Sequence, residues 1–139
     1  MDLNDKNLPT APLISLLYRK RAVYLNEKIK EVNLTFGLYP ILITISKNDG
    51  IIQEDLAKIY HLNQSTITRN LDKLEKKGFI TRTKDKRKKK VSLTKLGEKT
   101  AKKIKGYDDE WDEFIKKEIG EVEFNEFKKT LIKISKTLI

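Results

Sequence analysis

The sequence predicts a mainly α-helical protein with one small β-hairpin. Apolar residues recur at steps of three and four along most of the 139 residues, which is the spacing of amphipathic helices. Within residues 79–93, FITRT and KKVSL alternate instead in the manner of strands, around a basic centre. Two short helical segments, 53–60 and 64–77, come directly before them. A helix, a turn, a helix and a basic hairpin in this order are typical of a winged helix-turn-helix.

Two further helices are expected before this unit. The first runs from about Ala11 to Val32, after a loose lead-in of ten residues. The second is short and apolar, from Leu38 to Lys47 with Pro40 near its start, and Asn-Asp-Gly at 48–50 is typical of a turn. The apolar stripe of the first helix consists of Ile14, Tyr18, Ala22, Leu25 and Ile29.

The second helix of the helix-turn-helix has one apolar stripe and one polar face. Ile67, Leu71 and Leu74 are spaced four and three apart and therefore share one side. Asn63 is a suitable N-cap, and Gly78 stands where a helix C-terminus favours a left-handed residue. The opposite face carries Ser65, Arg69, Asp72, Lys73 and Lys76.

The polar start of this helix is the first candidate site. The early turns of a recognition helix meet base edges in the major groove. Arginine can bind guanine there through two hydrogen bonds, and hydroxyl groups can bind bases or phosphates. The alternative is an amphipathic surface helix with a solvated polar face. The candidate DNA-binding residues on this helix are Gln64, Ser65, Thr66, Thr68, Arg69 and Lys73.

The basic run KDKRKKK, residues 84–90, is the second candidate site. It carries six basic side chains and one acid, a net charge of +5. Most charge runs are solvated surface or tails. This one is a short internal loop held by strand-like segments at both ends, so it is expected to contact phosphates and the minor groove. Its candidate DNA-binding residues are Asp85, Arg87, Lys88 and Lys89.

Residues 50 to 99 resemble the core of the MarR family of transcriptional regulators. The matching pieces are the QE-x-LA helix, STITRNLDKLEKKGFI, and the D-x-R…VSLT-x-x-G hairpin and exit. The resemblance implies that Asp85 orients Arg87 at the hairpin tip and that the arginine enters the minor groove. Two departures are Ile52, where the family often has a capping Ser or Thr, and a hairpin expected to be short. The resemblance also implies a groove-reading face made of Ser65, Thr66, Thr68 and Arg69.

Long helices are expected after the hairpin. Thr94 is a suitable N-cap for a helix to about Ile119, Gly120 ends that helix, and a last helix begins near Glu121. The last helix has the three-four alternation of a helix packed against partners. Its apolar residues are Phe124, Phe127, Leu131, Ile134 and Leu138.

The terminal helices carry apolar stripes that must be buried against another surface. In the resembled family they interlock between two chains, which implies a homodimer that reads a palindrome. A monomer with its helices folded on themselves is the alternative. The expected organisation is an N-terminal dimerisation helix (1–32), a DNA-binding lobe (33–94, with the wing at about 79–93) and C-terminal dimerisation helices (95–139).

The charge distribution favours a polyanionic partner. The net charge is +10 and the sequence pI is about 9.6. Residues 82–103 hold eleven Lys or Arg and two acids, whereas residues 108–126 hold nine acids and two Lys. One region is therefore expected to meet DNA and the other to face away from it.

Several classes of protein are excluded or disfavoured. The chain has no cysteine, which excludes disulfides and thiolate metal sites, and the single His61 cannot make a typical zinc site. No metal or cofactor is expected. No phosphate loop, dinucleotide glycine pattern or nucleophile elbow is present, so an enzyme is disfavoured. No signal peptide or membrane-spanning apolar run is visible, and a cytoplasmic location without membrane contact is expected.

These observations together predict a sequence-specific regulator that binds double-stranded DNA as a homodimer, with repression implied by the resemblance. A winged helix used as an architectural or protein-interaction module, with only generic DNA binding, is the alternative. The resembled family often binds small aromatic or lipophilic effectors, although aromatic residues at helical spacing usually belong to the core. The candidate effector-binding residues are Tyr18, Tyr24, Phe36 and Tyr39.

Overall fold

The computed structural model describes residues 1–137, so Leu138, expected in the last helix, lies outside the described residues. The chain divides into two compact units, Met1–Ile104 and Lys105–Ile139. None of the helices within residues 1–137 combines the length and the apolar character that a membrane span requires.

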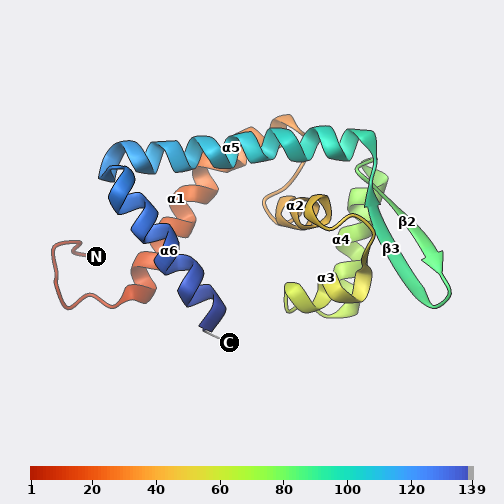
Figure 1. The fold of residues 1–139 in the computed structure, drawn as a ribbon, viewed down its shortest axis with the longest axis horizontal. Coiled ribbons are helices and arrows are strands. Elements are labelled where there is room, and N and C mark those ends of the chain that lie inside the picture. The colour runs from red at the N-terminus through yellow and green to blue at the C-terminus, as the bar shows by residue number, and fades with distance from the viewer. Residues whose placement is uncertain (138–139) are drawn as a thin grey trace. The chain divides into compact units, whose positions relative to one another are not determined.

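The first unit follows the predicted order of helices, and most helix ends lie within one residue of the predicted positions (Figure 1). A mainly α-helical winged helix-turn-helix is confirmed. The elements are α1 (Thr10–Glu31), α2 (Tyr39–Lys47), β1 (Ile51–Ile52), α3 (Gln53–Ile59), α4 (Gln64–Lys76), β2 (Ile80–Asp85), β3 (Lys88–Leu93) and the beginning of α5 (Lys95–Ile119).

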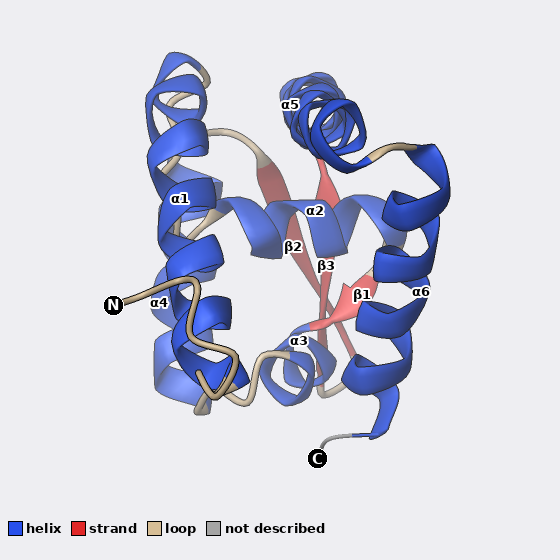
Figure 2. Ribbon diagram, turned by 90° about the vertical axis from the view of Figure 1, so that its left-hand side faces the viewer, coloured by secondary structure: helices blue, strands red, loops and turns tan. Residues whose placement is uncertain are grey.

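The strand β1 is an element that the sequence does not predict. Ile51 pairs with Val91 and Ile52 with Lys90, which gives an antiparallel sheet in the order β1-β3-β2 (red in Figure 2). Two residues are too few to show an alternating pattern. The pairing attaches the start of α3 to the hairpin.

The β2–β3 hairpin, called the wing below, has longer strands than the sequence predicts. The ladder continues to the pair Asp85 and Lys88, and the turn consists of Lys86 and Arg87 alone. The prediction of a basic loop over 84–90 is therefore wrong. Backbone pairing around a two-residue turn extends the ladder even though lysine has a low strand propensity.

The core of the first unit forms where the apolar stripes meet. Ile67, Leu71 and Leu74 of α4 are fully buried, as predicted, and the wing contributes Ile80 and Val91. Each such side chain stabilises the fold by about 1.5–3 kcal/mol. The remaining buried side chains include Leu25, Ile29, Leu42, Ile45, Leu56 and Phe79.

The ends of α3 and α4 are held by the same hydrogen-bond motif. The N–H of Gly78 donates to the carbonyl of Glu75 at 2.9 Å, and the N–H of Phe79 donates to that of Leu74 at 3.1 Å. This motif needs a left-handed residue after the helix, and Gly78 has φ +82°, as predicted. His61 has φ +51° and takes the equivalent position after α3, where it turns the chain towards α4.

The second unit contains the rest of α5 and α6 (Glu121–Thr137). Gly120 joins the two helices with φ +87°. Phe124 is buried, and the ammonium group of Lys116 lies 5.2 Å from the centre of its ring. Much of the predicted stripe of α6 is exposed within this chain. Among its described residues, the exposed large apolar side chains are Phe114, Ile119, Val122, Leu131, Ile132 and Ile134.

Candidate nucleic-acid interface

The start of α4 is held by an N-cap that also engages one of the predicted site residues. Oδ1 of Asn63 accepts hydrogen bonds from the backbone N–H of Thr66 and from the hydroxyl of Ser65, both at 2.8 Å. The predicted cap is confirmed. Because the cap satisfies one of the unpaired N–H groups, the first turn of α4 is ordered before any partner arrives.

The predicted groove-reading residues do not all face the same way. Gln64, Ser65 and Arg69 are exposed, as is Lys73 one turn later. A guanidinium nitrogen of Arg69, Nη2, lies 3.4 Å from Oγ1 of Thr66, a weak hydrogen bond that leaves the side chain available to a partner.

Thr68 differs from these residues because its hydroxyl is used inside the protein. Oγ1 of Thr68 donates to the carbonyl of Gln64 at 2.7 Å and accepts from Nε2 of Gln53 at 2.8 Å. Thr68 is half-buried and its hydroxyl is directed towards α3.

The two faces of the wing carry different charges. Side chains of paired residues lie on the same face, so Lys84 and Lys89 share the face of Arg82 and the buried Val91. The opposite face carries Asp85, Thr83, Lys88 and Lys90. The first face therefore has only positive charge at its outer end, and the second combines positive and negative charge.

The wing tip differs from the arrangement that the family resemblance implies. Among residues 1–137, Asp85 forms its ion pair with Lys90, at 3.2 Å, and not with Arg87. Arg87 is exposed at the turn beside Lys86, which has φ +59°. The expectation that Asp85 orients Arg87 is thus not met in this structure, because the diagonal pair across the hairpin takes the carboxylate.

Arg82 connects the wing to α4. Its Nε donates to Glu75 at 3.1 Å and its Nη2 donates to Asp72, so one guanidinium on β2 holds two carboxylates one turn apart on α4. The hydrogen bond to Glu75, followed by that to Asp72 and by the charges of both acids, raises the pKa of Arg82 against the opposing effect of burial. Arginine is protonated at neutral pH even without this shift, so the clamp carries its full positive charge there.

Replacing Arg82 by methionine is expected to lower the free energy of unfolding by about 1 kcal/mol, because both acids are partly exposed and their attraction is screened. DNA affinity should also fall, since two uncompensated carboxylates would lie on the DNA-reading helix. Denaturant unfolding and duplex titration measure the two effects. Asp72→Asn with Glu75→Gln in the Arg82→Met background should restore affinity, and Arg19→Met on α1 serves as the control. Unchanged affinity in Arg82→Met would contradict this role.

The start of α5 packs closely against the segment that joins α4 to the wing. The hydroxyl of Thr94 donates to the carbonyl of Gly78 at 2.6 Å and accepts from the N–H of Gly97 at 3.0 Å, so the predicted N-cap is confirmed. A Cβ at Gly97 would lie 2.1 Å from the carbonyl oxygen of Phe79. On the other side, the hydroxyl of Tyr60 donates to the carbonyl of Pro40 at 2.7 Å.

Three of the four aromatic residues predicted for effector binding lie together in the first unit. The ring of Phe36 is 5.5 Å from that of Tyr18 and 5.4 Å from that of Tyr39, and the guanidinium of Arg21 lies over both Phe36 and Tyr39. The ammonium group of Lys28 lies 4.8 Å from the centre of the Tyr24 ring.

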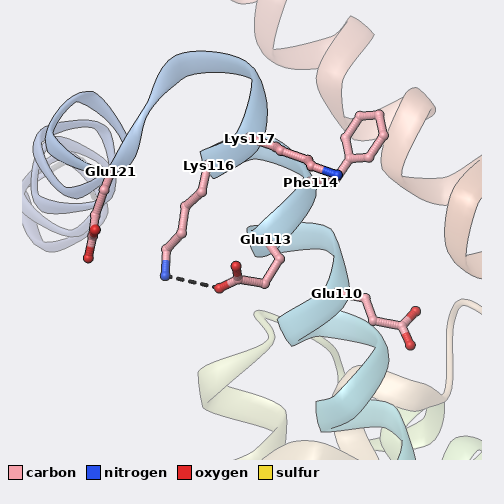
Figure 3. Close-up of a pocket in the computed structure, with 6 residues that line it drawn as sticks. All are labelled: Glu110, Glu113, Phe114, Lys116, Lys117 and Glu121. Atoms are coloured by element: carbon pink, nitrogen blue, oxygen red, sulfur yellow. Dashed lines mark hydrogen bonds and ion pairs between the residues drawn. The ribbon is translucent and has the colours of Figure 1, made fainter.

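A hollow of about 570 Å³ lies in the second unit, and none of the four predicted effector-binding residues lines it (Figure 3). Lys116 and Glu113 form an ion pair of 3.2 Å across it, and Phe114 points away from that pair. Its wide opening and mixed charges do not suggest a particular ligand. The lining residues are Glu110, Glu113, Phe114, Lys116, Lys117 and Glu121.

Two residues that shape the interface, Arg82 and Gln53, are absent from the sequence-based set. Lys84 belongs to the predicted basic run but not to its named candidates, and continuing the strand alternation through the run would have added it. Arg82 and Gln53 carried no comparable signal, because their partners lie on α4 and only the folded chain brings them together.

Residues 34–92 match the sequence pattern of the MarR family. Over 122 residues the chain is 31% identical to BilQ, an HTH-type transcriptional regulator of Clostridioides difficile (strain CD3), and the alignment covers 86% of this chain and 82% of BilQ. Over 55 residues it is 44% identical to YybA, an HTH-type transcriptional regulator of Bacillus subtilis (strain 168). That match covers 40% of this chain and spans 37% of the length of YybA.

The fold is similar to that of solved family members. A MarR-family transcriptional regulator from Listeria monocytogenes, solved in complex with a 26mer DNA, superposes with a TM-score of 0.83 at 27% identity. The match covers 94% of this chain and 89% of the other. The fold, with its helix-turn-helix and clamped wing, agrees with the family match over residues 34–92 and with the similarity to BilQ over most of both chains. This chain therefore belongs to the MarR family of transcriptional regulators.

Proposed function

We propose that this regulator binds a specific double-stranded DNA operator as a homodimer and represses transcription by occluding a promoter. The observation that carries the proposal is the Arg82 clamp, which ties the basic wing to the second half of α4, the helix whose capped start exposes Gln64, Ser65 and Arg69. The related Listeria monocytogenes regulator was solved with DNA, which supports the same use of this surface.

The two parts of the surface take different roles. Gln64, Ser65, Thr66 and Arg69 read base edges in the major groove, where a bidentate arginine–guanine contact discriminates by about 1–3 kcal/mol. Lys73 and the wing, through Arg87 and its lysines, contact phosphates and the minor groove, which adds affinity without sequence preference.

Exposed apolar side chains support the homodimer. On α1 the predicted stripe is buried at Leu25 and Ile29 but exposed at Ile14 and Tyr18. In the second unit, Val122 is 80% exposed and Leu131 and Ile134 are also exposed. Apolar surfaces of this kind favour burial against a second copy of the chain. Two-fold symmetry then presents two copies of α4 to a palindrome.

An effector would act on the same surface indirectly. The ring of Tyr18 is exposed and lies 5.5 Å from that of Phe36, so this pair offers a stacking surface to a small aromatic ligand. Tyr39 is buried and belongs to the core instead. Such a ligand would release the operator if it favoured a dimer in which the two copies of α4 are wrongly spaced.

The direct test is binding to the DNA just upstream of this protein's own coding sequence, against a scrambled duplex of equal length. Fluorescence anisotropy at about 0.15 M salt suppresses weak generic binding. A preference of about a thousandfold or more is expected for a sequence-specific regulator. Equal and strongly salt-dependent binding to both would favour the architectural alternative or an operator elsewhere, which a random-sequence library would locate.

Arg69→Ala is expected to reduce the preference for the operator by about 5- to 150-fold, the equivalent of 1–3 kcal/mol, with little change in affinity for the scrambled duplex. The matched control is Lys76→Ala, an exposed residue of the last turn of α4. An equal loss on both duplexes in Arg69→Ala would assign this residue to phosphate contact instead.

A further inference from the structure

Gln53 joins three elements of the DNA-binding lobe although it is not exposed to a partner. It is the first residue of α3 and directly follows β1, which is paired to the wing. Its side chain is 6% exposed, and its Nε2 donates to Oγ1 of Thr68 on α4 at 2.8 Å. The sheet, α3 and the second turn of α4 therefore meet at this amide.

The hydroxyl of Thr68 is committed to this contact. It donates its only proton to the carbonyl of Gln64 and uses one acceptor site for Gln53. Thr68 therefore has little capacity left for a base edge, whereas its neighbour Arg69 is exposed.

The other half of the Gln53 amide is not satisfied. Among the described residues, Oε1 of Gln53 is a buried acceptor without a hydrogen-bond partner. Such an acceptor lowers folding stability, and a methionine would fill similar space without it. The unpaired acceptor therefore offsets part of the stability that the hydrogen bond to Thr68 contributes, and the amide as a whole adds little to folding.

We propose that Gln53 is a positioning residue for DNA recognition. Its donated hydrogen bond to Thr68 adds to the buried stripe of α4 and sets the final rotation of the helix about its own axis, which decides how Ser65 and Arg69 meet the groove. The inference rests on the proposed function. A side chain as long as arginine ends far from the helix axis, so a small rotation moves its guanidinium by more than a hydrogen bond tolerates.

A double-mutant cycle tests this assignment with Gln53→Met, Thr68→Val and the combined variant. Each is titrated with the duplex that the wild type selects from a random-sequence library and with a scrambled duplex. Gln53→Met is expected to reduce the preference for the selected duplex about tenfold, within the range of one lost base contact. Its melting temperature should stay close to that of the wild type, because removal of the buried acceptor offsets the loss of the hydrogen bond to Thr68.

The combined variant separates positioning from direct contact. If Gln53 acts through Thr68, the double substitution discriminates no worse than Gln53→Met alone. A further loss on adding Thr68→Val would mean that Thr68 reads DNA independently, and the proposal would fail. A fall in the melting temperature of Gln53→Met together with the loss of sequence preference would show that Gln53 has a purely structural role. That result would also overturn the proposal.

A measurement without DNA distinguishes this proposal from the proposed function. Amide hydrogen exchange at Thr68 and Arg69 in the free protein is expected to be severalfold faster in Gln53→Met. If the wild type selects no duplex, the proposed function fails and the exchange result alone decides whether Gln53 positions α4. Unchanged exchange rates would overturn the positioning role whatever the DNA results.

Discussion

Gly97→Ala is expected to lower the free energy of unfolding by about 3 kcal/mol or more, at the upper end of overpacking effects. The added Cβ would lie 2.1 Å from the carbonyl oxygen of Phe79 and 3.1 Å from its carbonyl carbon, and both are backbone atoms that cannot rotate away. The clash with Phe79 can be relieved only by a shift of the first turn of α5 relative to the wing. Because small domains are stable by only about 5–15 kcal/mol, the loss should be plain in denaturant unfolding.

Gly106→Ala is the matched control for this substitution. Gly106 lies in the same helix, and among the described residues nothing lies within 4 Å of an added Cβ. Alanine should stabilise the helix interior there by about 1 kcal/mol. If both substitutions changed the free energy of unfolding in the same direction, steric contact with Phe79 would not be the reason for a glycine at position 97.

Replacing Lys84, Lys88, Lys89 and Lys90 of the wing by glutamine is expected to weaken binding to every duplex alike, by several hundredfold at about 0.15 M salt. Each phosphate contact contributes about 0.9 to the slope of log K against log salt, which corresponds to about fivefold in affinity at that concentration. The slope should fall by up to about four. Anisotropy titrations over a range of salt concentrations measure both quantities.

The two faces of the wing supply an internal control for this experiment. Lys84 and Lys89 share the face of Arg82, whereas Lys90 is paired with Asp85 on the opposite face with Lys88. Replacing Lys84 and Lys89 should account for the larger part of the fall in the slope of log K against log salt. A larger change from the Lys88 and Lys90 pair would show that the mixed face meets the phosphates. A change in sequence preference in either pair would contradict the division of roles between wing and helix.

Local rules sufficed for the helices of the DNA-binding lobe. Asn63 caps α4, Thr94 caps α5 and Gly78 takes the left-handed position because each effect involves only a few neighbouring residues. The stripe at Ile67, Leu71 and Leu74 is buried because its spacing places it on one face in any fold that covers α4.

Local rules failed where pairing partners are distant in sequence. β1 exists because Ile51 and Ile52 meet β3, about forty positions later in the chain. The wing strands extend into the basic run for a similar reason, since the ladder hydrogen bonds of the partner strand outweigh the weak strand propensity of lysine.

The sequence alone was enough to predict the kind of surface, a polar helix start beside a basic hairpin, because residue type and period specify charge and amphipathic faces. Only the tertiary structure decided which side chains are available to a partner. Arg82 binds Asp72 and Glu75, and Gln53 occupies the hydroxyl of Thr68, through contacts between elements. Hydrogen-bond partners are chosen by distance in space, and a periodic pattern carries no information about distances between elements.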